Sequence, residues 1–414
     1  MERNKVIYLV GIGMGDLDYL VSYAEQKIAQ ADIYIGAKRM LEPFAHYQGK
    51  RLRSYKPKEM REYLTQEKEW QSAVVLLSGD SGFFSGAKGI LEEFADTSYE
   101  IQCIPGISSI SYFSAKLGMN WEDMYIASAH GRKENLIGRI VQNERTFALL
   151  SSGSQLQELC EKLQYYGKNE IKLSVGENLS YEEGEEGAEG ERIMQGSPAE
   201  IQKQSWGNLI CMIAENQAPE KRMGEIKDEE FIREKVPMTK CEVRTVSIAK
   251  LDLQETSVIY DIGAGTGSVS VEIAAKYPGT RVYAMERNAE AVSLIEENKR
   301  KFTTDNVEII SGEALEVLQN SELEVPTHVF VGGSGGNFKE LAECLFTRNP
   351  ELHMVANAVS LNSIAEIYKT VEDLQLQADV VSMNVSKSRQ MGGYHMMMAN
   401  NPVYIFDITK TADR

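Results

Sequence analysis

A glycine-rich loop in the second half of the chain carries the residue pattern with the clearest chemistry. The loop Asp261-Ile-Gly263-Ala-Gly265-Thr-Gly267 follows an apolar run typical of a buried strand. Glycines after a strand let the backbone approach a ligand closely, and the following helix offers N–H donors. The next apolar run ends in Glu286, 23 positions after Gly263, where a carboxylate can accept hydrogen bonds from both hydroxyls of a ribose. The pattern predicts an adenosyl-binding site, which a dinucleotide would also fit.

Two further features favour S-adenosylmethionine over a dinucleotide. Asp261 would repel a pyrophosphate, but it suits the cationic amino-acid end of the sulfonium donor. A third predicted strand ends at Gly312-Glu313-Ala314, from which an acidic or backbone group can meet the edge of an adenine. Together with Glu286, these features predict a Rossmann-like methyltransferase in the second half of the chain.

The first half of the chain opens with a similar loop but lacks the acid. Gly11, Gly13 and Gly15 follow a β-type run at 5–10, and the next short strand ends in Gly36. The ribose partner of a dinucleotide fold is therefore missing at that position. Composition and spacing leave open how this loop binds a ligand, or whether it binds one.

The elements that must position these residues alternate between strands and helices. In the first half, strands are predicted at 5–10, 32–35, 74–77 and 101–104. Alternation of this kind predicts a mainly parallel α/β sheet, in which ligands gather beyond the carboxyl ends of the strands. Three strand-ending loops therefore form a candidate pocket; they carry Gly11 to Gly15, Gly79-Asp80-Ser81 and Ser108-Ser109.

The pattern divides the chain into two domains. From about residue 121 the texture of the strands changes, residues 215–236 are polar and strand-free, and a fresh α/β pattern follows. The predicted divisions are a domain at 1–214 with subdomains of about 1–118 and 119–214, a linker at 215–236, and a domain at 237–414.

Composition bounds the class of protein. The net charge of −17 disfavours a nucleic acid or an anionic membrane as partner, because both need a basic surface. No apolar run approaches the ~18 residues of a membrane span, and the N-terminal residues lack the flanks of a signal peptide. The five cysteines never stand in CxxC spacing, and the five histidines show no metal-ligand spacing. We expect a cytoplasmic protein without a bound metal.

Several motifs resemble two known families. VGIGMGDLDYL, SGDSGFFSG, IPGISSI and ASAHGR, in that order, resemble the tetrapyrrole (corrin/porphyrin) methylases. The second half is similar to the C-15 methyltransferases and decarboxylases of cobalamin synthesis. Its matching motifs are PMTKCEVR at 237–244, DIGAGTGSVSVE at 261–272, AMERN at 284–288, GEA at 312–314 and VGGSGG at 331–336.

The resemblance implies an α/β fold, a reaction and a cofactor. The implied architecture is an N-terminal tetrapyrrole-methylase fold of two α/β subdomains and a C-terminal Rossmann-like class I methyltransferase with an antiparallel final strand. The implied reaction is S-adenosylmethionine-dependent methylation of a (cobalt-)precorrin at C-5 by the first domain. The second domain would methylate C-15 and decarboxylate the C-12 acetate. We expect two S-adenosylmethionine sites per chain, a small-molecule precorrin substrate and a homo-oligomer.

The resemblance also implies which residues contact the donor. In the first domain these are Gly11, Gly13, Gly15, Gly79, Asp80, Ser81, Ser108 and Ser109. In the second domain these are Asp261, Gly263, Gly265, Gly267, Glu286, Glu313, Ala314 and Gly332.

The substrate's carboxylates need charge-assisted donors, preferably arginine. Arg132 and Arg244 are favoured because each lies in a family motif, and His130 is a candidate for proton removal at C-5. A loop-packing role fits His130 equally well, and a solvated surface charge is the alternative for each basic residue. The other candidates are Lys38, Arg39, Lys133, Lys240, Lys387 and Arg389.

Three expectations concern packing at particular segments. The runs 380–385 and 402–408 are predicted to close the second sheet as an antiparallel pair. Met396-Met397-Met398 is expected to be buried in a sheet, and Trp121 is expected to lie in a core.

Three alternatives remain open from the residues alone. The chain could be a dinucleotide-dependent oxidoreductase, a binding module with degenerate donor sites, or a methyltransferase of RNA or of another small metabolite. Asp261 and the missing acid after Gly36 argue against the first, and the acidic charge argues against RNA.

Overall fold

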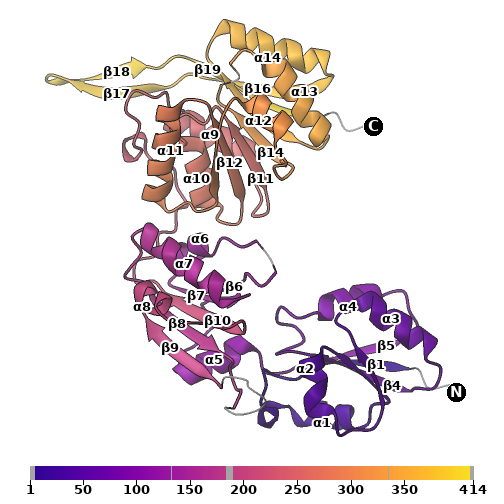
Figure 1. Cartoon of the computed structure of the whole chain (residues 1–414). Coiled ribbons are helices and arrows are strands. Elements are labelled where there is room, and N and C mark those ends of the chain that lie inside the picture. Colours follow the sequence, from indigo (N-terminus) through magenta and orange to yellow (C-terminus); the bar gives the residue numbers. More distant parts are fainter. Residues whose placement is uncertain (1–4, 132, 183–189, 334, 411–414) are drawn as a thin grey trace. The chain divides into compact units, whose positions relative to one another are not determined.

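The computed structural model describes residues 5–131, 133–182, 190–333 and 335–410 (Figure 1). The chain separates into two compact units. Unit 1 comprises Met1–Arg132, Arg145–Glu161 and Asn169–Glu215, and unit 2 comprises Lys133–Glu144, Lys162–Lys168 and Asn216–Arg414.

Unit 1 begins with a five-stranded parallel sheet in the order β3-β2-β4-β1-β5. The strands are β1 Val6–Gly11, β2 Ile33–Gly36, β3 Lys50–Arg53, β4 Ser72–Leu77 and β5 Glu100–Ile104, and the helices between and after them are α1 Ser22–Ala29, α2 Lys38–Leu41, α3 Pro57–Gln66, α4 Ala87–Glu93 and α5 Ser109–Leu117. Alternate residues of β1 enter different cores: Leu9 packs in one cluster and Val10 in another. Both faces of the sheet are therefore covered, as is usual for parallel sheets.

The second sheet of unit 1 is mixed and has the order β6-β7-β10-β8-β9. Only β6 and β7 pair in parallel, and the other neighbours are antiparallel. Its strands are β6 Tyr125–Ser128, β7 Arg145–Leu150, β8 Lys172–Glu177, β9 Arg192–Gly196 and β10 Ile210–Glu215, with α7 Gly153–Tyr165 and α8 Pro198–Gln202 beside them. Helix α5 joins the two sheets, because its Ile110 and Phe113 pack with Phe147 and Ile213 of the second sheet. The expected pair of α/β subdomains is present.

Unit 2 is a three-layer α/β structure around a seven-stranded sheet in the order β13-β12-β11-β14-β15-β19-β16 (Figure 1). The strands are β11 Val258–Ile262, β12 Arg281–Glu286, β13 Val307–Ser311, β14 His328–Val331, β15 His353–Ala358, β16 Leu376–Met383 and β19 Val403–Lys410, and the helices are α9 Cys241–Lys250, α10 Ser268–Lys276, α11 Ala289–Phe302, α12 Ala314–Asn320, α13 Phe338–Arg348 and α14 Leu361–Asp373. Helices α9 to α11 cover one face of this sheet, and helices α12 to α14 cover the other.

The last two strands of this sheet confirm the predicted antiparallel closure. Strand β19 runs antiparallel to both β15 and β16, and β11 to β15 are parallel. The expected α/β fold class, with an antiparallel final strand in the second domain, is therefore confirmed.

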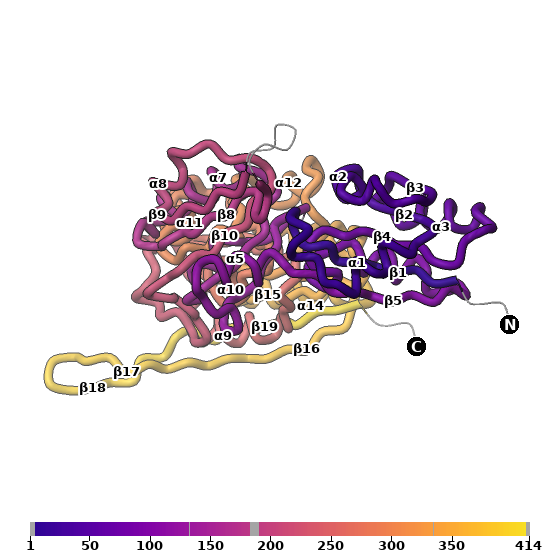
Figure 2. Tube along the Cα trace, turned by 90° about the horizontal axis from the view of Figure 1, so that it is seen from below, coloured from indigo at the N-terminus to yellow at the C-terminus, as the bar shows by residue number. Residues whose placement is uncertain are grey.

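A two-stranded hairpin, β17 Ser386–Met391 with β18 Tyr394–Ala399, was not predicted. It extends away from the body of unit 2 (Figure 2). Met396, Met397 and Met398 lie in it and are 44–66% exposed, so the expectation that they are buried is wrong. The run of apolar residues suits a buried strand, but all residues of the described hairpin are exposed, so neither of its faces is covered by a second layer.

Trp121 is also not in a core. Its side chain is 41% exposed, at a turn between α5 and β6. Large aromatic residues are often only partly buried, so residue type alone does not settle their position.

Candidate functional sites

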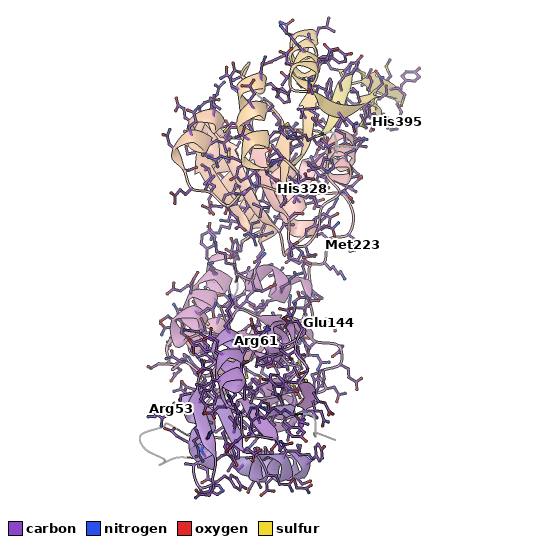
Figure 3. All side chains as sticks on the ribbon, turned by 90° about the vertical axis from the view of Figure 1, so that its right-hand side faces the viewer. Arg53, Arg61, Glu144, Met223, His328 and His395 are labelled. Carbon is purple, nitrogen blue, oxygen red and sulfur yellow. The ribbon has the colours of Figure 1, made fainter. Side chains whose placement is uncertain are left out.

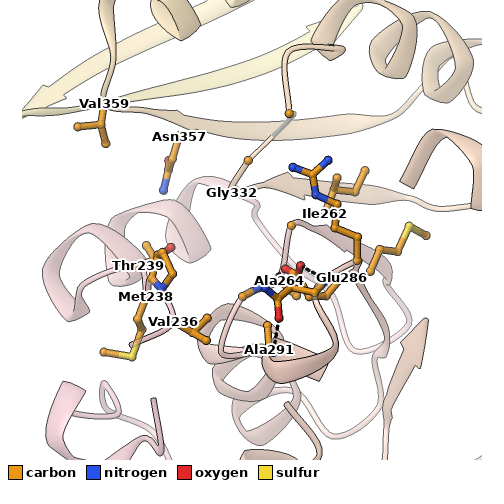
Figure 4. A pocket seen from close by; sticks show the side chains of 18 of the residues that line it. Val236, Met238, Thr239, Ile262, Ala264, Glu286, Ala291, Gly332, Asn357 and Val359 are labelled. Atoms are coloured by element: carbon orange, nitrogen blue, oxygen red, sulfur yellow. Dashed lines mark hydrogen bonds between the residues drawn. The ribbon is translucent and has the colours of Figure 1, made fainter. Parts of the chain in front are cut away.

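A cavity of about 740 Å³ opens at the carboxyl ends of the parallel strands of unit 2. This is the position at which open α/β sheets bind ligands. Of the residues predicted to contact the donor, the ones that line it are Gly263, Gly265, Glu286, Glu313, Ala314 and Gly332. Figure 4 shows the cavity, with Glu286, Ala264 and Gly332 on one side and Thr239 and Asn357 on the other.

The glycine loop after β11 depends on the absence of side chains. Gly263 and Gly265 have φ angles of +70° and +57°, which favour glycine. A Cβ on Gly263 would lie 2.8 Å from the carbonyl oxygen of Gly333, and a Cβ on Gly265 would lie 2.9 Å from that of Pro237. Gly267 does not line the cavity; a Cβ there would lie 3.0 Å from a side-chain carbon of Ile295. Gly267 therefore serves helix packing rather than the cavity wall.

Glu286, the last residue of β12, ties the glycine loop to its own strand end. Its Oε2 accepts a hydrogen bond from the Gly265 amide at 2.9 Å, and its Oε1 accepts one from the Asn288 amide at 2.9 Å (Figure 4). Each oxygen keeps a second lone pair for a ligand. The carboxylate is thus fixed in the cavity wall at the place where the sequence predicts ribose recognition.

The third predicted segment also reaches the cavity. Glu313 stands at the N-cap position of α12 without a side-chain capping hydrogen bond, and its carboxylate forms an ion pair with Arg287 at 2.9 Å; Ala314 is the first residue of that helix. Gly332 follows β14, and its amide donates to the Ile262 carbonyl at 3.0 Å. The ends of four parallel strands therefore contribute to one cavity.

Asp261 lies beneath the loop and not in the cavity wall. It is 1% exposed, and its Oδ2 accepts hydrogen bonds from the Ser270 amide and hydroxyl. Its Oδ1 is buried without a hydrogen-bond partner among the described residues. Burial, opposed by the Ser270 hydrogen bonds and assisted by the charge of Glu286, raises the pKa of Asp261 to about 6.

Arg244 was predicted to grip substrate carboxylates, but it is fully buried and does not line the cavity. Its guanidinium donates to Glu272 Oε2 at 2.6 Å, to Asp228 Oδ1 at 3.3 Å and to the carbonyls of Thr239 and Ile226. A guanidinium with these acceptors holds the segment before α9 against α10. We therefore correct the prediction: Arg244 stabilises the fold of unit 2 and is not available in the cavity to bind substrate carboxylates.

Lys240 does line the cavity, and its Nζ lies 3.9 Å from Asp228 Oδ2. Lys387, on the hairpin, forms an ion pair with Glu242 at 2.7 Å, whereas Arg389 is exposed. Of these three cations, Lys240 is the one that the structure places in the cavity wall.

Several polar residues of the cavity were not singled out from the sequence, among them Glu242 of α9, Asn357 of β15, and Asn400 and Asn401 between β18 and β19. Asn357 is fixed by hydrogen bonds with the Ser247 hydroxyl. No spacing along the chain connects these residues, because the sheet brings together segments more than a hundred positions apart. Glu242 alone had a local signal, since it lies within the PMTKCEVR motif.

In unit 1, three loops meet at the carboxyl ends of β1, β4 and β5. Gly13 and Gly79 exchange backbone hydrogen bonds, and Asp80 Oδ2 accepts from the Gly106 amide at 3.0 Å. A Cβ on Gly11 would lie 2.7 Å from the Gly79 carbonyl oxygen, so the loops pack backbone against backbone. The predicted residues of the first two loops therefore lie together.

The other predicted residues of unit 1 border this junction. Ser108 caps α5, since its hydroxyl accepts from the Ser111 amide, and Ser109 is the first residue of that helix. Ser81 is buried after β4, and its amide faces Gly11. Gly15 packs against the ring of Tyr181, which lies in the segment after β8 of the second sheet. The junction thus joins both sheets of unit 1.

The candidates for substrate binding in the N-terminal half come from separate segments, and one of them, Lys133, belongs to unit 2. His130 is exposed after β6, and Arg132 lies outside the described residues. Lys38 pairs with Glu42, Arg39 donates to the Tyr181 hydroxyl, and Lys133 is exposed. Geometry does not select among them.

Within the described ranges, no group of three or more His, Cys, Asp and Glu side chains is placed to hold a metal ion. His328 lies in the sheet of unit 2 and His395 on its hairpin (Figure 3). The part of the chain that the structure covers also contains no helix with the length and apolar character to cross a bilayer.

Two family models match two separate parts of the chain. Residues 6–190 match the family described as Tetrapyrrole (Corrin/Porphyrin) Methylases. Residues 230–410 match the family described as Precorrin methyltransferase domain.

Individual relatives match somewhat less than half of the chain. A probable cobalt-precorrin-6B C(15)-methyltransferase (decarboxylating) of Pyrobaculum calidifontis is 40% identical over 183 residues, which are 44% of this chain and 93% of the relative. The cobalt-precorrin-6B C(15)-methyltransferase (decarboxylating) of Salmonella typhi is 35% identical over 45% of this chain and 96% of its own. A crystal structure of precorrin-6Y C5,15-methyltransferase from Geobacter metallireducens aligns with 46% of this chain and 98% of its own, with 38% identity and a TM-score of 0.43. The chain belongs to the precorrin methyltransferase family, with a tetrapyrrole methylase domain preceding the precorrin methyltransferase domain.

Proposed function

We propose that this chain is a bifunctional, S-adenosylmethionine-dependent precorrin methyltransferase of cobalamin synthesis. Its C-terminal domain would methylate a (cobalt-)precorrin at C-15 and decarboxylate the C-12 acetate, and its N-terminal domain would methylate C-5. The observation that carries the proposal is the cavity of unit 2, where the glycine loop, Glu286 and the Glu313-Ala314 segment form one wall. We further propose the domain boundaries 1–214 and 237–414, with a linker between them.

The residues of this wall fit an adenosyl sulfonium. Glu286 offers free lone pairs for the ribose hydroxyls, and Gly263 and Gly265 expose backbone without a Cβ. Beneath them, the Asp261 carboxyl has one buried oxygen without a partner among the described residues, which suits the positive end of the donor and opposes a pyrophosphate. S-adenosylmethionine, when bound, supplies an electrophilic methyl group.

The protein's own contribution is positioning. An in-line displacement needs the acceptor carbon held close to the methyl group with water excluded. The wall opposite Glu286, with Thr239 and Asn357, is left for the macrocycle (Figure 4). Lys240 and Lys235 line the cavity as cations that can pair with substrate carboxylates.

For the N-terminal domain we propose a second donor site at the junction of the three loops. The support is the meeting of Gly11 to Gly15, Gly79 to Ser81 and the start of α5. Backbone amides and carbonyls dominate this junction, so the donor would be recognised mainly by backbone groups. Two donor sites per chain follow.

Titration with S-adenosylhomocysteine tests the number of sites. We expect two sites per chain, of which Glu286→Gln weakens one. Gly13→Ala should weaken the other, with Gly118→Ala as the matched control, because both glycines have a positive φ and open space around a Cβ. One site or none, or binding of NAD in place of the homocysteine compound, would contradict the proposal.

Incubation with a methyl-labelled donor and each candidate precorrin tests the reaction. NMR of the product should place one label at C-5 and one at C-15, with loss of one carboxylate as CO₂. A labelled product without methyl at C-15 would assign the C-terminal domain to another substrate.

A further inference from the structure

Glu242 is the carboxylate of the unit 2 cavity that the donor site does not use. It lies in the first turn of α9 and lines the cavity. Its Oε1 accepts a hydrogen bond from the ammonium of Lys387, 2.7 Å away on β17. Its Oε2 is buried and has no hydrogen-bond partner among the residues that the structure describes. Thr239, three residues earlier, lies across the pocket from Glu286 (Figure 4), so α9 starts on the side that is left for the acceptor.

The reaction proposed above contains two proton steps. When methyl replaces hydrogen at C-15, the sulfur keeps the electrons of its broken bond, the ring carbon bonds to the methyl group, and one proton leaves. When the acetate loses CO₂, the electron pair of the broken carbon–carbon bond stays on the remaining carbon, which must take up one proton. The two steps balance, so a single group that accepts and returns a proton would serve both.

The other ionisable side chains of the cavity are less suited to carry this proton. Glu286 is bound to two backbone amides, and Glu313 is paired with Arg287. Lys235, Arg287 and Glu290 are exposed to solvent, and Lys240 is a cation that serves the carboxylates better. Glu242 combines a place in the cavity wall with an oxygen that has no partner among the described residues.

We propose that Glu242 is a catalytic residue of the C-terminal domain, which accepts the proton released at C-15 and returns it to the carbon left by decarboxylation. Lys387 is its positioning residue. This inference rests on the proposed function and adds to it the group that moves the proton. It also assigns a function to the β17–β18 hairpin, because Lys387 lies at the base of that hairpin.

The charges around Glu242 keep it ready to accept a proton. Burial opposes ionisation, but the hydrogen bond and charge of Lys387 and the charge of Arg244 outweigh it and hold the pKa of Glu242 below its usual value. The groups that act on Lys387 in turn are Glu242, Asp228 and Cys241, and they raise its pKa. Lys387 therefore stays charged where Glu242 is ionised.

The test uses the full chain, the labelled donor and the precorrin substrate. Glu242→Gln should lower the rate of C-15 methylation with decarboxylation by about 10²–10⁴-fold, while C-5 methylation and the affinity for S-adenosylhomocysteine stay unchanged. The matched control is Asp373→Asn, which removes a lysine-paired carboxylate of the same domain away from the cavity. If the wild-type chain places no methyl at C-15, the proposed function fails; if Glu242→Gln is as fast as Asp373→Asn, only this inference fails.

Lys387→Met provides a second measurement, the pH dependence of the C-15 methylation rate. A purely structural role of Glu242 would leave this pH dependence unchanged. Without the ammonium group the pKa of Glu242 rises, so the acid limb of the C-15 rate against pH should shift upward by about one unit or more. The shift should be absent from Lys387→Met in the Glu242→Gln background. An unshifted profile in the single variant overturns the inference, whatever the folding of Glu242→Gln.

Discussion

The two glycine loops share a sequence pattern, but the structure holds them in place by different means. The loop after β1 packs against neighbouring loops, where Gly13 pairs with Gly79 through backbone bonds and a Cβ on Gly106 would lie 2.4 Å from the Gly79 carbonyl oxygen. The loop after β11 is held by a carboxylate from the next strand, because Glu286 accepts from the Gly265 amide.

This difference extends to the surroundings of each loop. Near the second loop lie the buried carboxyl of Asp261 and the buried pair of Arg244 with Glu272. At the junction in unit 1, the carboxylate of Asp80 is only half-buried, and its two oxygens accept from the Gly82 and Gly106 amides. The comparison teaches that one pattern, G-x-G-x-G after a strand, is compatible with a site built from close backbone contacts and with one built from fixed charges. The first should be sensitive to added volume and the second to removed or titrated charge.

Arg244→Met has the largest expected effect, because it removes a buried charge near the glycine loop of unit 2. It leaves Glu272, whose side chain is fully buried, without its arginine. We expect a loss of about 3–5 kcal/mol in the free energy of unfolding of the C-terminal domain, measured by urea unfolding. Lys339→Met, which breaks the more exposed pair with Asp373, should cost less than about 1 kcal/mol. Equal effects of the two variants would show that the buried pair has no special weight.

Asp261→Asn tests the buried carboxyl of unit 2 through the pH dependence of the free energy of unfolding. Since burial raises the pKa of Asp261 to about 6 in the folded state from its ordinary value of 3.8, the buried charge destabilises the fold above pH 6. This penalty is relieved as pH falls from 6 to about 4, where the folded state binds a proton before the unfolded state does. The stability gained by Asp261→Asn over wild type should therefore be larger at pH 8 than at pH 4 by about 2.4 kcal/mol.

Urea titrations of wild type and Asp261→Asn at the two pH values measure this difference directly. Other carboxylates titrate in both proteins and cancel in the comparison. A difference between the variants that does not change with pH would mean that Asp261 ionises in the folded state as easily as in water.

Gly106→Ala tests the close backbone packing of the loops in unit 1. Its Cβ would meet the carbonyl oxygens of Gly79 and Gly11 at 2.4 and 2.5 Å, and backbone atoms cannot move aside as a side chain can. We expect a loss of about 2 kcal/mol in the stability of the N-terminal domain and weaker binding of the donor product there. Gly86→Ala is the control, because its Cβ would make only an ordinary contact at 3.9 Å. If both variants are equally stable, the close packing of the loops is not what holds them.

The sequence predicted much of the C-terminal cavity because its signals are local. Gly263, Gly265 and Glu286 each follow a recognisable apolar run, and the order of such runs determines which strand ends become neighbours. Gly312 to Ala314 were found in the same way, whereas Gly332 was implied by the resemblance of the VGGSGG motif. The structure brings all of them to one cavity, while their contacts with a donor stay a prediction.

Arg244 and Glu242 show where this reasoning stops. Both lie in one motif, and nothing local distinguishes the buried framework residue from the residue in the cavity wall. Arg244 can be buried because its guanidinium donates to the carboxylate of Glu272, which lies 28 positions later on α10. Similarly, Met396 to Met398 have a strand pattern, but their exposure depends on whether another layer covers that strand. Burial is a tertiary property, and single-sequence patterns do not contain it.

Gly265→Ala gives the smallest expected effect and the sharpest comparison with Gly106→Ala. Its Cβ would lie 2.9 Å from the Pro237 carbonyl oxygen, in the segment that leads into α9, and the residue has a positive φ. Because this segment lies outside the sheet and can shift slightly, we expect a cost of only about 1 kcal/mol in stability. The larger share of the effect should fall on the C-terminal donor site, whose Gly265 amide is bound to Glu286. Calorimetric titration should show weaker S-adenosylhomocysteine binding at that site alone. Gly336→Ala, with a positive φ but open space around its Cβ, should cost similar stability without weakening binding; if it weakens binding equally, strain in the loops and not the carboxylate contact sets the affinity.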